Sequence, residues 1–497
     1  MHPLMTLLGI VYVFCAVLLA AYGTSLLILV MLYLRFRPDR PTPDPPPLKE
    51  WPSVVVQLPV YNEANVVRRL IDAAAALDYP RDRFSVQVLD DSDDHTSALV
   101  AARVEHYRAR GLDIQHVRRT SRKGFKAGAL AHGLNYTQAE VVALFDADFL
   151  PPPDFLRQTV PHLMARPETG IVQARWGHLN ATENALTRAQ ALALDTHYMV
   201  EQATRSRAGL LLSFGGSAGI WRRACIEDAG GWQDRTVTED LDLSYRAQLR
   251  GWRCVFVPHV EVPGEVPPQM AAYKRQQARW AKGTTQCLLA HGPRLFRSGR
   301  GVFRALMGLM HLGQYLAQPL VLILLVLTVP LMLGNALHHL NLSALGVLSI
   351  VPTLAYMLSQ HALYRRWPSR LGLALPALVV LGVSTTLNNT LAVCDAILGR
   401  PNEFKRTPKF GQGAWQHSSY ALLADRTVIA EAALAVYVSV GMVLAVWRGN
   451  LAVLPFFAIY ALGCGGMVLT ALLETRRVMQ REAKRASEVR VRVSHRR

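Results

Sequence analysis

The sequence predicts a mostly parallel α/β domain inserted between membrane-spanning helices. Three segments, 4–34, 305–364 and 371–394, contain no Asp, Glu, Lys or Arg, and about 20 apolar residues are enough to cross a bilayer as a helix. Between the first two segments, strand-like and helix-like apolar patterns alternate. A chain of 497 residues with 51% hydrophobic and 18% charged residues arranged in this way is not a single soluble enzyme. Its composition also excludes disordered, collagen-like and disulfide-rich proteins.

The N-terminal segment 1–36 is interpreted as a retained transmembrane helix rather than a signal peptide. It lacks a basic start and is about twice as long as the apolar core of a signal peptide. Arg35 and Arg37 follow the apolar run, which places its N-terminus outside by the positive-inside rule. The next stretch, 37–52, carries seven prolines and predicts a stiff, extended linker.

Residues 53–282 predict alternating strands and helices, and therefore a mostly parallel sheet. The expected strands are 53–58, 86–89, 114–117, 141–145 and 170–174, and the expected helices are 64–77 and 97–110. In such sheets, ligands bind beyond the carboxyl ends of the strands. Acidic residues follow two of these strands directly, in the pairs Asp90–Asp91 and Asp146–Asp148.

The second pair has the spacing of a cation site. Asp146 and Asp148 are separated by one residue and come directly after the buried run VVALF. Two carboxylates in this position can share Mg²⁺ or Mn²⁺, hard cations that take oxygen ligands together with substrate phosphates. The alternative is a solvated turn after a strand.

The segment Thr238-Glu239-Asp240 opens an amphipathic helix. Acidic residues at a helix start are also expected for capping and for the helix dipole alone. The functional interpretation is that Asp240 is a general base that deprotonates a hydroxyl, which requires a raised pKa in a closed site.

A third motif lies on one face of a predicted helix, because Gln276, Arg279 and Trp280 are spaced i, i+3, i+4. Arginine suits a diphosphate, and tryptophan suits the apolar face of a sugar ring. The alternative is a basic interfacial helix whose Trp lies at the membrane surface.

Two glycine-rich stretches complete the candidate site. In SRKGFKAGAL, small residues around Lys126 open a helix to which a nucleotide phosphate could come close. In SFGGSAG, which includes Gly216 and Ser217, two glycines inside an apolar stretch predict a tight loop beside a ligand, with an ordinary turn as the alternative.

In this order, these motifs resemble the D, DxD, TED and QxxRW signature of the processive family 2 glycosyltransferases, which include cellulose, chitin and hyaluronan synthases. The resemblance covers 51–411 and is strongest to the cellulose-synthase-like A and C groups. It implies a cytosolic GT-A domain combined with α-helical transmembrane segments. The stretch FKRTPK, with Phe404, Thr407 and Lys409, resembles the gating loop of bacterial cellulose synthases, although Arg406 replaces its Val and Pro408 intervenes.

For the donor, the resemblance implies that Asp90 and Asp91 hold the nucleoside base. It also implies that Lys126 and Asp146 hold the diphosphate. Asp148, together with Asp146, would bind the Mg²⁺ or Mn²⁺ cofactor.

For the reaction, the resemblance implies that Asp240 is the catalytic base of an inverting transfer. Gln276 and Arg279 would stabilise the leaving diphosphate, and Trp280 would stack on the acceptor sugar. The remaining substrate-binding residues implied are Thr238, Glu239, Gly216 and Ser217.

The implied enzyme is a hexosyltransferase that elongates a β-glycan from a nucleotide sugar and exports it through its own helices. The donor is open between UDP-glucose and GDP-mannose, with a slight preference for UDP-glucose. The alternative enzyme makes one transfer to a lipid, as ceramide glucosyltransferases do. A non-catalytic transporter or receptor is disfavoured because all motif acids are present. The expected partners are the donor, the glycan acceptor and the lipid bilayer, without nucleic acid.

The charges outside the apolar runs set the expected topology. Residues 476–497 hold nine Arg or Lys against two Glu, a net charge of +7. The positive-inside rule favours a position on the inner side of the membrane for this tail, and the tail lies inside only if 371–398 does not cross the bilayer. We therefore expect an interfacial or re-entrant helix at 371–398. The expected order is an interface helix 283–304, two transmembrane helices in 305–364, the segment 371–398, a gating-like loop 399–413, two transmembrane helices in 427–473 and a basic cytosolic tail 474–497. We expect a multi-pass protein of a bacterial inner membrane with a cytoplasmic catalytic domain.

Overall fold

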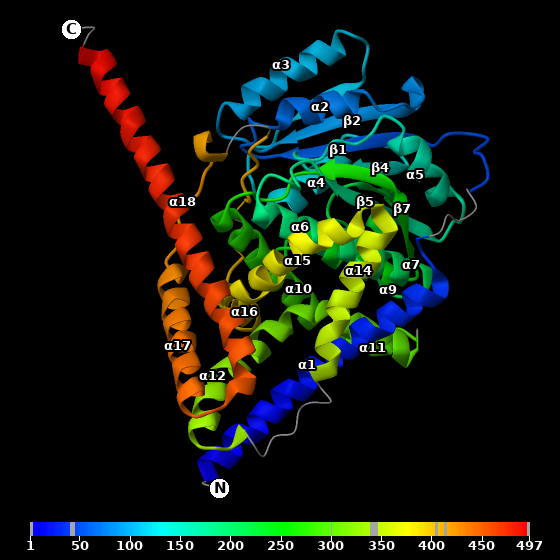
Figure 1. Cartoon of the computed structure of the whole chain (residues 1–497). Coiled ribbons are helices and arrows are strands. Elements are labelled where there is room, and N and C mark those ends of the chain that lie inside the picture. Colours follow the sequence, from blue (N-terminus) through cyan, green and yellow to red (C-terminus); the bar gives the residue numbers. More distant parts are fainter. Residues whose placement is uncertain are drawn as a thin grey trace.

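The computed structural model describes residues 3–39, 45–299, 301–337, 346–402, 406–411 and 415–494. A sheet with its covering helices forms one end of the molecule, and long helices extend from the other (Figure 1). Part of the predicted linker 37–52 and Phe404 of the gating-like loop lie outside the described residues.

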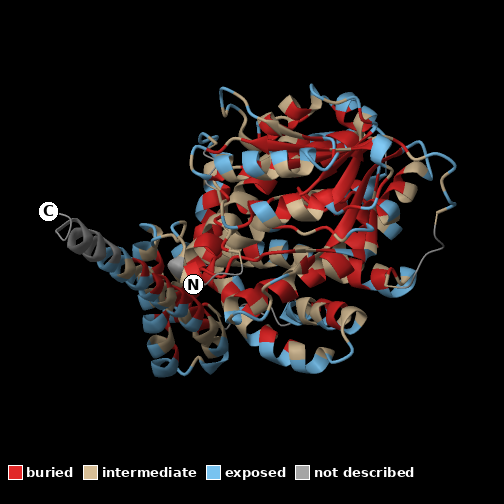
Figure 2. Cartoon of the chain, turned by 90° about the horizontal axis from the view of Figure 1, so that it is seen from above, coloured by how far each residue is buried: buried red, intermediate tan, exposed pale blue. Residues whose placement is uncertain are grey.

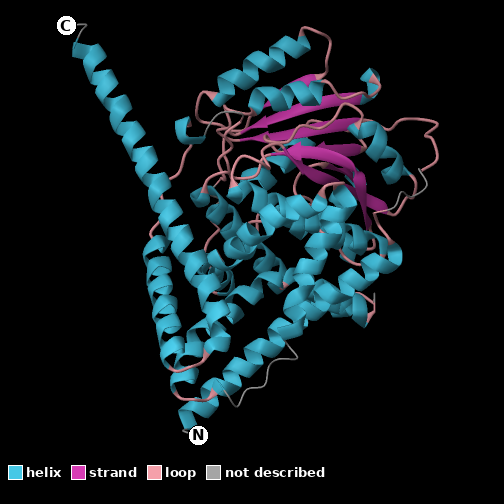
Figure 3. Cartoon of the chain, in the orientation of Figure 1, coloured by secondary structure: helices cyan, strands magenta, loops and turns pink. Residues whose placement is uncertain are grey.

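The described residues form a seven-stranded mixed sheet in the order β3-β2-β1-β4-β6-β5-β7. The strands are β1 (Val54–Val60), β2 (Phe84–Asp90), β3 (Ile114–Val117), β4 (Val141–Leu144), β5 (Thr169–His178), β6 (Gly219–Arg222) and β7 (Arg253–Gly264). β1 to β4 pair in parallel, as do β5 and β7, whereas β6 runs antiparallel to both of its neighbours. The predicted mostly parallel α/β domain is confirmed, and the sheet lies above the helical part in Figure 3.

Helices cover both faces of this sheet. They are α2 (Val67–Ala75), α3 (Thr96–Arg108), α4 (Phe125–Leu134), α5 (Phe155–Met164), α8 (Arg223–Asp228) and α9 (Glu239–Leu249). Along β1, Val54, Val56 and Leu58 enter one core cluster and Val55 enters the other, as the alternation of a strand requires. Because both faces are buried, as Figure 2 shows, the strands read as continuous apolar runs in the sequence.

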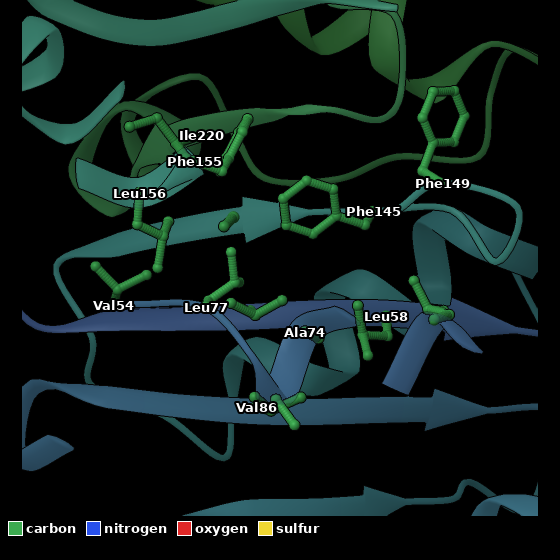
Figure 4. Close-up of a cluster of buried hydrophobic side chains, with 14 of the residues drawn as sticks. Val54, Leu58, Ala74, Leu77, Val86, Phe145, Phe149, Phe155, Leu156 and Ile220 are labelled. Carbon is green, nitrogen blue, oxygen red and sulfur yellow. The ribbon is translucent and has the colours of Figure 1, made fainter. Parts of the chain in front are cut away.

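The larger core joins the first half of the sheet to α2 and α5. Figure 4 shows Phe145 and Phe155 side by side above Leu77 and Val54, and their rings meet edge to face with centroids 4.9 Å apart. This packing fixes the end of β4, and with it the position of the aspartates that follow Phe145.

Long helices form the remainder of the chain. They are α1 (Pro3–Phe36), α6 (Ala185–Thr196), α7 (Ala203–Arg207), α10 (Met270–Arg297), α11 (Val302–Leu312), α12 (Ala317–Leu333), α14 (Val351–Leu363), α15 (Trp367–Ser384), α16 (Thr386–Ile397), α17 (Thr427–Trp447) and α18 (Leu454–Ser494). Within the described residues, five helical segments are long and apolar enough to cross a membrane: Pro3–Phe36, Gln314–Leu333, Trp367–Ser384, Thr427–Trp447 and Leu451–Lys484.

Two boundaries differ from the sequence-based expectation. The predicted start of an interface helix at 283 falls inside α10, which is continuous for 28 residues. The predicted helix 371–398 divides into α15 and α16 at Thr385. By length and composition, α15 qualifies as a span, whereas Val347–Leu363 is shorter. In Figure 1, however, α15 runs across the direction of α17 and α18, along the sheet domain.

A buried ion pair joins α10 to α17. Lys274 Nζ lies 2.7 Å from Glu431 Oε1 and 3.3 Å from the more exposed Asp425. Glu431 is fully buried, and the Thr427 hydroxyl also accepts a hydrogen bond from Lys274. Two of the long helices are therefore held together by a charge pair whose members depend on each other.

We predict that Glu431→Leu destabilises the protein by about 2–3 kcal/mol, because it leaves the buried Lys274 ammonium with only its weaker partner. Thermal unfolding in detergent would measure this loss. The double variant Lys274→Met/Glu431→Leu should recover most of it, and equal stability of the single variant and the parent chain would contradict the prediction.

Candidate active site

Lys126 lies at the centre of the site. Its Nζ lies 2.6 Å from Asp146 Oδ1 and 3.6 Å from Glu239 Oε1, and it donates a hydrogen bond to the carbonyl oxygen of Gly216 at 2.8 Å. Burial lowers the pKa of Lys126, but the surrounding carboxylates, Asp146 first, outweigh burial and raise it. A buried ammonium group therefore joins α4, the loop after β4 and the start of α9.

Asp146 and Asp148 occupy different environments after β4. The Asp146 backbone N–H donates to Ser217 Oγ at 3.0 Å, and its side chain stays about one-third exposed at 34%. Asp148 is buried, and its Oδ2 accepts a hydrogen bond from Lys409 Nζ at 2.7 Å. Within the described residues, Asp148 Oδ1 is buried without a hydrogen-bond partner. Burial raises the pKa of Asp148 although Lys409 lowers it.

Asp240 lies in the first turn of α9 and is held by its own backbone. Its Oδ1 accepts a hydrogen bond from the Leu241 N–H at 2.8 Å. Burial and the neighbouring Glu239 raise the pKa of Asp240 to about 7, although Lys126 and Arg279 lower it. A carboxyl group with this pKa can accept a proton near neutral pH.

Gly216 makes room for that carboxylate. Its φ of +81° is rare for residues with a side chain, and a Cβ atom built there would clash with Asp240 Oδ2. The loop predicted at SFGGSAG therefore lies against the carboxylate, with Ser217 holding the Asp146 backbone behind it.

Thr238 plays a different part from the capping role that its position suggests. It precedes α9 but makes no side-chain capping hydrogen bond. Its side chain is instead buried against α10, where a Cβ atom at Gly283 would clash with it. Thr238 thus fixes the start of α9 on α10.

Gln276, Arg279 and Trp280 lie on one face of α10, as predicted, and line the same cleft as Lys126 and Asp240. The helix is fixed behind them by Lys274 and by the contact of Gly283 with Thr238. The structure therefore brings the TED and QxxRW motifs together, although Asp240 and Gln276 are 36 positions apart along the chain.

Two cavities meet at this point. The first cleft contains Asp91, Lys126, Asp146, Asp148 and Arg279. The second lies between the sheet domain and the long helices and reaches Leu26 of α1 and Tyr356 of α14. The side chains or backbone that line both are Trp176, Leu194, Gly215, Asp240 and Trp280.

Residues 406–411 of the gating-like loop lie at the first cleft. Arg406 pairs with the buried Glu63 at 3.3 Å, and its carbonyl oxygen accepts a hydrogen bond from Arg275 of α10. Glu265 accepts hydrogen bonds from the backbone N–H groups of Phe410 and Gly411 at 3.1 and 3.2 Å. Thr407 and Lys409 both line the cleft, as the sequence leads us to expect of a loop that reaches the site.

Asp90 and Asp91 separate in space. Asp91 lines the cleft and forms a two-pronged ion pair with Arg119, at 2.5 and 2.7 Å. Asp90 is buried beside the cleft and bonds to His116 and to the Ser92 N–H. Burial alone would raise the pKa of Asp90, but these hydrogen bonds lower it to about 2. The geometry gives Asp90 a structural place rather than a ligand-facing one.

Comparisons with known proteins agree with this geometry. Residues 52–283 match the family described as "Glycosyltransferase like family 2". This segment is a family 2 glycosyltransferase domain. The chain is 43% identical over 262 residues to glucomannan 4-beta-mannosyltransferase 1 of Oryza sativa subsp. japonica, covering 50% of each chain. It is 46% identical over 239 residues to glucomannan 4-beta-mannosyltransferase 1 of Cyamopsis tetragonoloba, covering 47% of this chain and 45% of the relative. The chain thus spans about half the length of these curated relatives.

The glycosyltransferase fold also has a solved counterpart. The structure is similar, with a TM-score of 0.54 and 22% identity, to a mannosyltransferase from Pyrobaculum calidifontis solved in complex with GDP-Man and Mn²⁺. The match covers 79% of this chain and all of the other. The predicted GT-A fold with additional membrane-type helices is confirmed.

The glycosyltransferase cleft contains residues that the sequence analysis did not select. His178 ends β5 and lines the cleft, and its Nε2 lies 3.0 Å from Asp195 Oδ1. Gln360 of α14 donates to the other Asp195 oxygen at 2.9 Å. His178 follows a strand just as the aspartates do, so the same strand-end rule could have found it. Glu63, by contrast, is recognised only through its contact with the distant Arg406.

We predict that Gly216→Ala lowers glycosyl transfer by about 10²-fold, because the new methyl group displaces the Asp240 carboxylate. Gly231→Ala is the matched control, since Gly231 also has a positive φ, +70°, but open space around its Cβ position. Initial rates and thermal unfolding of both variants would separate backbone strain from the clash. An equal loss of rate in the two variants would contradict the prediction.

Proposed function

We propose that this protein transfers mannose from GDP-mannose to a growing β-1,4-linked mannan or glucomannan chain and moves the chain into the membrane helices. The observation that carries the proposal is the meeting of two cavities at Asp240 and Trp280. One cavity has the basic and acidic groups that suit a nucleotide diphosphate. The other is lined by aromatic residues and extends towards α1 and α14.

The choice of mannose rests on the relatives. Both named relatives are glucomannan mannosyltransferases, at 43% identity over 262 residues and 46% identity over 239 residues. This similarity replaces the slight sequence-based preference for UDP-glucose. The neighbouring solved structure shares the fold and carries GDP-Man with Mn²⁺.

In the proposed reaction, Asp240 takes the proton from the acceptor hydroxyl as that oxygen attacks the sugar carbon. Its raised pKa and its position at the junction of the cavities suit this role. Gly216 and the Leu241 N–H hold the carboxylate in place. The attack inverts the configuration, so an α-linked donor gives a β-glycoside.

Lys126, Gln276 and Arg279 would hold the departing diphosphate. Their donors converge on one cleft, and two of them are cations that stabilise the charge on the leaving oxygen. Asp148 and Asp146 fit a divalent cation, because the buried Asp148 Oδ1 has no hydrogen-bond partner in the described structure. When bound, Mg²⁺ or Mn²⁺ would neutralise phosphate charge there.

The acceptor would lie in the second cavity. Trp280 lines both spaces, so its ring can stack on the sugar that receives the new unit. Beyond it, Tyr198, Tyr315 and Tyr356 line the path towards the helices. Asp91, and not Asp90, would contact the nucleoside base.

The glycosyltransferase domain would lie on the cytosolic side, because Arg35 and Arg37 at the end of α1 precede it in sequence and the basic end of α18 lies on the side of the molecule that holds the sheet (Figure 1). The relatives are plant proteins, which gives no support to a bacterial inner membrane. The proposal therefore concerns the side of the membrane and not the organism.

The decisive experiment supplies membranes containing the protein with radiolabelled GDP-mannose or UDP-glucose, each with Mg²⁺ or Mn²⁺. A long polymer made from GDP-mannose and cut by a β-mannanase would support the proposal. Label from UDP-glucose alone, in a glucan cut by an endoglucanase, would overturn the donor. Label confined to an organic-extractable lipid would overturn chain elongation.

We predict that Asp240→Asn abolishes transfer while leaving donor binding intact, because the amide cannot accept a proton but keeps the shape of the site. A loss of at least about 10³-fold is expected when the base is removed, as for other general bases. Binding of GDP-mannose by calorimetry is the second readout. Asp234→Asn, which changes an exposed aspartate outside this cleft, should retain both glycosyl transfer and donor binding.

The pH profile provides a separate prediction. Since the pKa of Asp240 is raised to about 7, its carboxyl group is protonated below that pH and cannot act as a base. We expect kcat/KM to fall about tenfold for each pH unit below about 7 and to level off above it. The pKa of the nearby Glu63 is also raised to about 7, chiefly by burial. Titration of Glu63 would therefore give the same profile, and Glu63→Gln removes that alternative. If Asp240 is the base, this variant should keep the profile. A rate independent of pH between 5 and 8 would contradict the assignment of Asp240 as the base.

A further inference from the structure

A second polar pocket lies between α9 and α10, away from the glycosyltransferase cleft. Five arginines line it: Arg235, Arg246, Arg250, Arg294 and Arg297. None of them lines the catalytic cleft or the cavity that joins it.

The acids near this pocket do not balance its arginines. Arg235 and Arg246 share the buried Asp242, whose Oδ1 also bonds to His291. Arg250 pairs with Asp228 at 3.1 Å. In the described part of the chain, neither Arg294 nor Arg297 forms an ion pair with a carboxylate. Arg246 also donates to the carbonyl oxygens of Ala229 and Gly231, so the excess of positive charge that suits an oxyanion lies chiefly on Arg294 and Arg297.

Exposed apolar side chains adjoin the pocket. On α10, Leu289 and Phe296 are 54% and 51% exposed and lie two turns apart on one face. Arg297 follows Phe296 directly and lies beside this strip, whereas Arg294 lies further round the same helix. At the start of α11, Phe303 is 50% exposed. Large apolar residues exposed together beside arginines are typical of a surface that lies on lipid.

The position of α11 places this surface at the membrane boundary. Met307 of α11 packs with Leu29 of α1 in one buried cluster, and α1 ends seven residues later at Phe36. Figure 1 shows α11 beside the sheet-domain end of α1. The arginine pocket is therefore next to the level at which a candidate membrane span leaves the bilayer.

We propose that this pocket binds the phosphate of an anionic phospholipid, with its acyl chains along Leu289, Phe296 and Phe303. Guanidinium groups bind phosphate oxygens in pairs, and basic pockets beside membrane helices suit anionic headgroups. The apolar strip favours a lipid over a free phosphate. Because α10 carries Gln276, Arg279 and Trp280 at its other end, the lipid also fixes the helix that lines the catalytic cleft.

The test uses the purified full-length chain, stripped of lipid and titrated with phosphatidylglycerol or phosphatidylcholine in native mass spectrometry. The parent chain should retain phosphatidylglycerol preferentially. Arg294→Gln/Arg297→Gln should weaken that binding about 25-fold, since each arginine near an anionic lipid contributes about fivefold. Arg365→Gln/Arg366→Gln removes two exposed arginines from another cluster beside the apolar runs and should leave binding unchanged.

A second arm distinguishes a lipid from a free phosphate. Phe296→Ser should weaken phosphatidylglycerol binding without changing the weak binding of soluble glycerol phosphate. Equal binding of glycerol phosphate and phosphatidylglycerol, or unchanged lipid binding in Phe296→Ser, would overturn the lipid assignment. Unchanged lipid binding in Arg294→Gln/Arg297→Gln would overturn the pocket itself. Both arginines are exposed, and thermal unfolding would verify that the variants fold.

Discussion

The buried ammonium group of Lys126 is the interaction on which the site depends. It contacts Asp146 after β4, Glu239 at the start of α9 and the Gly216 carbonyl before β6. Without a cation in this place, three carboxylates including Asp240 would lie together in a desolvated cleft and repel one another. Lys126 is thus the reason that acids from separate motifs can be packed together. It also keeps the pKa of Asp240 near neutrality rather than far above it, because the ammonium group of Lys126 opposes the effects of burial and of Glu239 on that pKa.

The long helix α10 transmits this arrangement to the rest of the molecule. One of its faces lines the catalytic cleft, and Lys274 pairs with Glu431 of α17. Thr238 packs at Gly283, so α9 and Asp240 follow the position of the same helix. Arg275 contacts the backbone of the loop at Arg406. A shift of α10 would therefore change the catalytic carboxylate, the loop and the membrane-type helices together.

The sequence was sufficient to predict those elements in which a local residue pattern coincides with the chemistry of the site. Apolar runs followed directly by acids located β2 and β4, and i, i+3, i+4 spacing located the face of α10. It was insufficient for contacts made by distant segments. β6 was missed because four residues of an antiparallel strand inside a glycine-rich stretch carry little periodicity. The pairing of Glu63 with Arg406 joins residues 343 positions apart, and no local signal announces it. The separation of Asp90 from Asp91 arises because neighbouring residues at a strand end point to opposite sides, so only one of them can face the cleft.

Each of the two aspartates after β4 contacts a different lysine: Lys126 contacts Asp146, and Lys409 contacts Asp148. Lys126 is fixed, because it belongs to α4 and also bonds to Gly216. Lys409 belongs to the loop 406–411, whose attachments to the sheet domain include Arg406 to Glu63 and the backbone of Phe410 and Gly411 to Glu265. Lys409 contributes a single positive charge to Asp148, and the proposed divalent cation would contribute two at the same carboxylate. Lys409 contacts Oδ2 and leaves Oδ1 without a partner in the described structure, so the proposed cation would bind the same carboxylate that the loop contacts. The position of the loop and the occupancy of the donor cleft are in that case linked through one carboxylate.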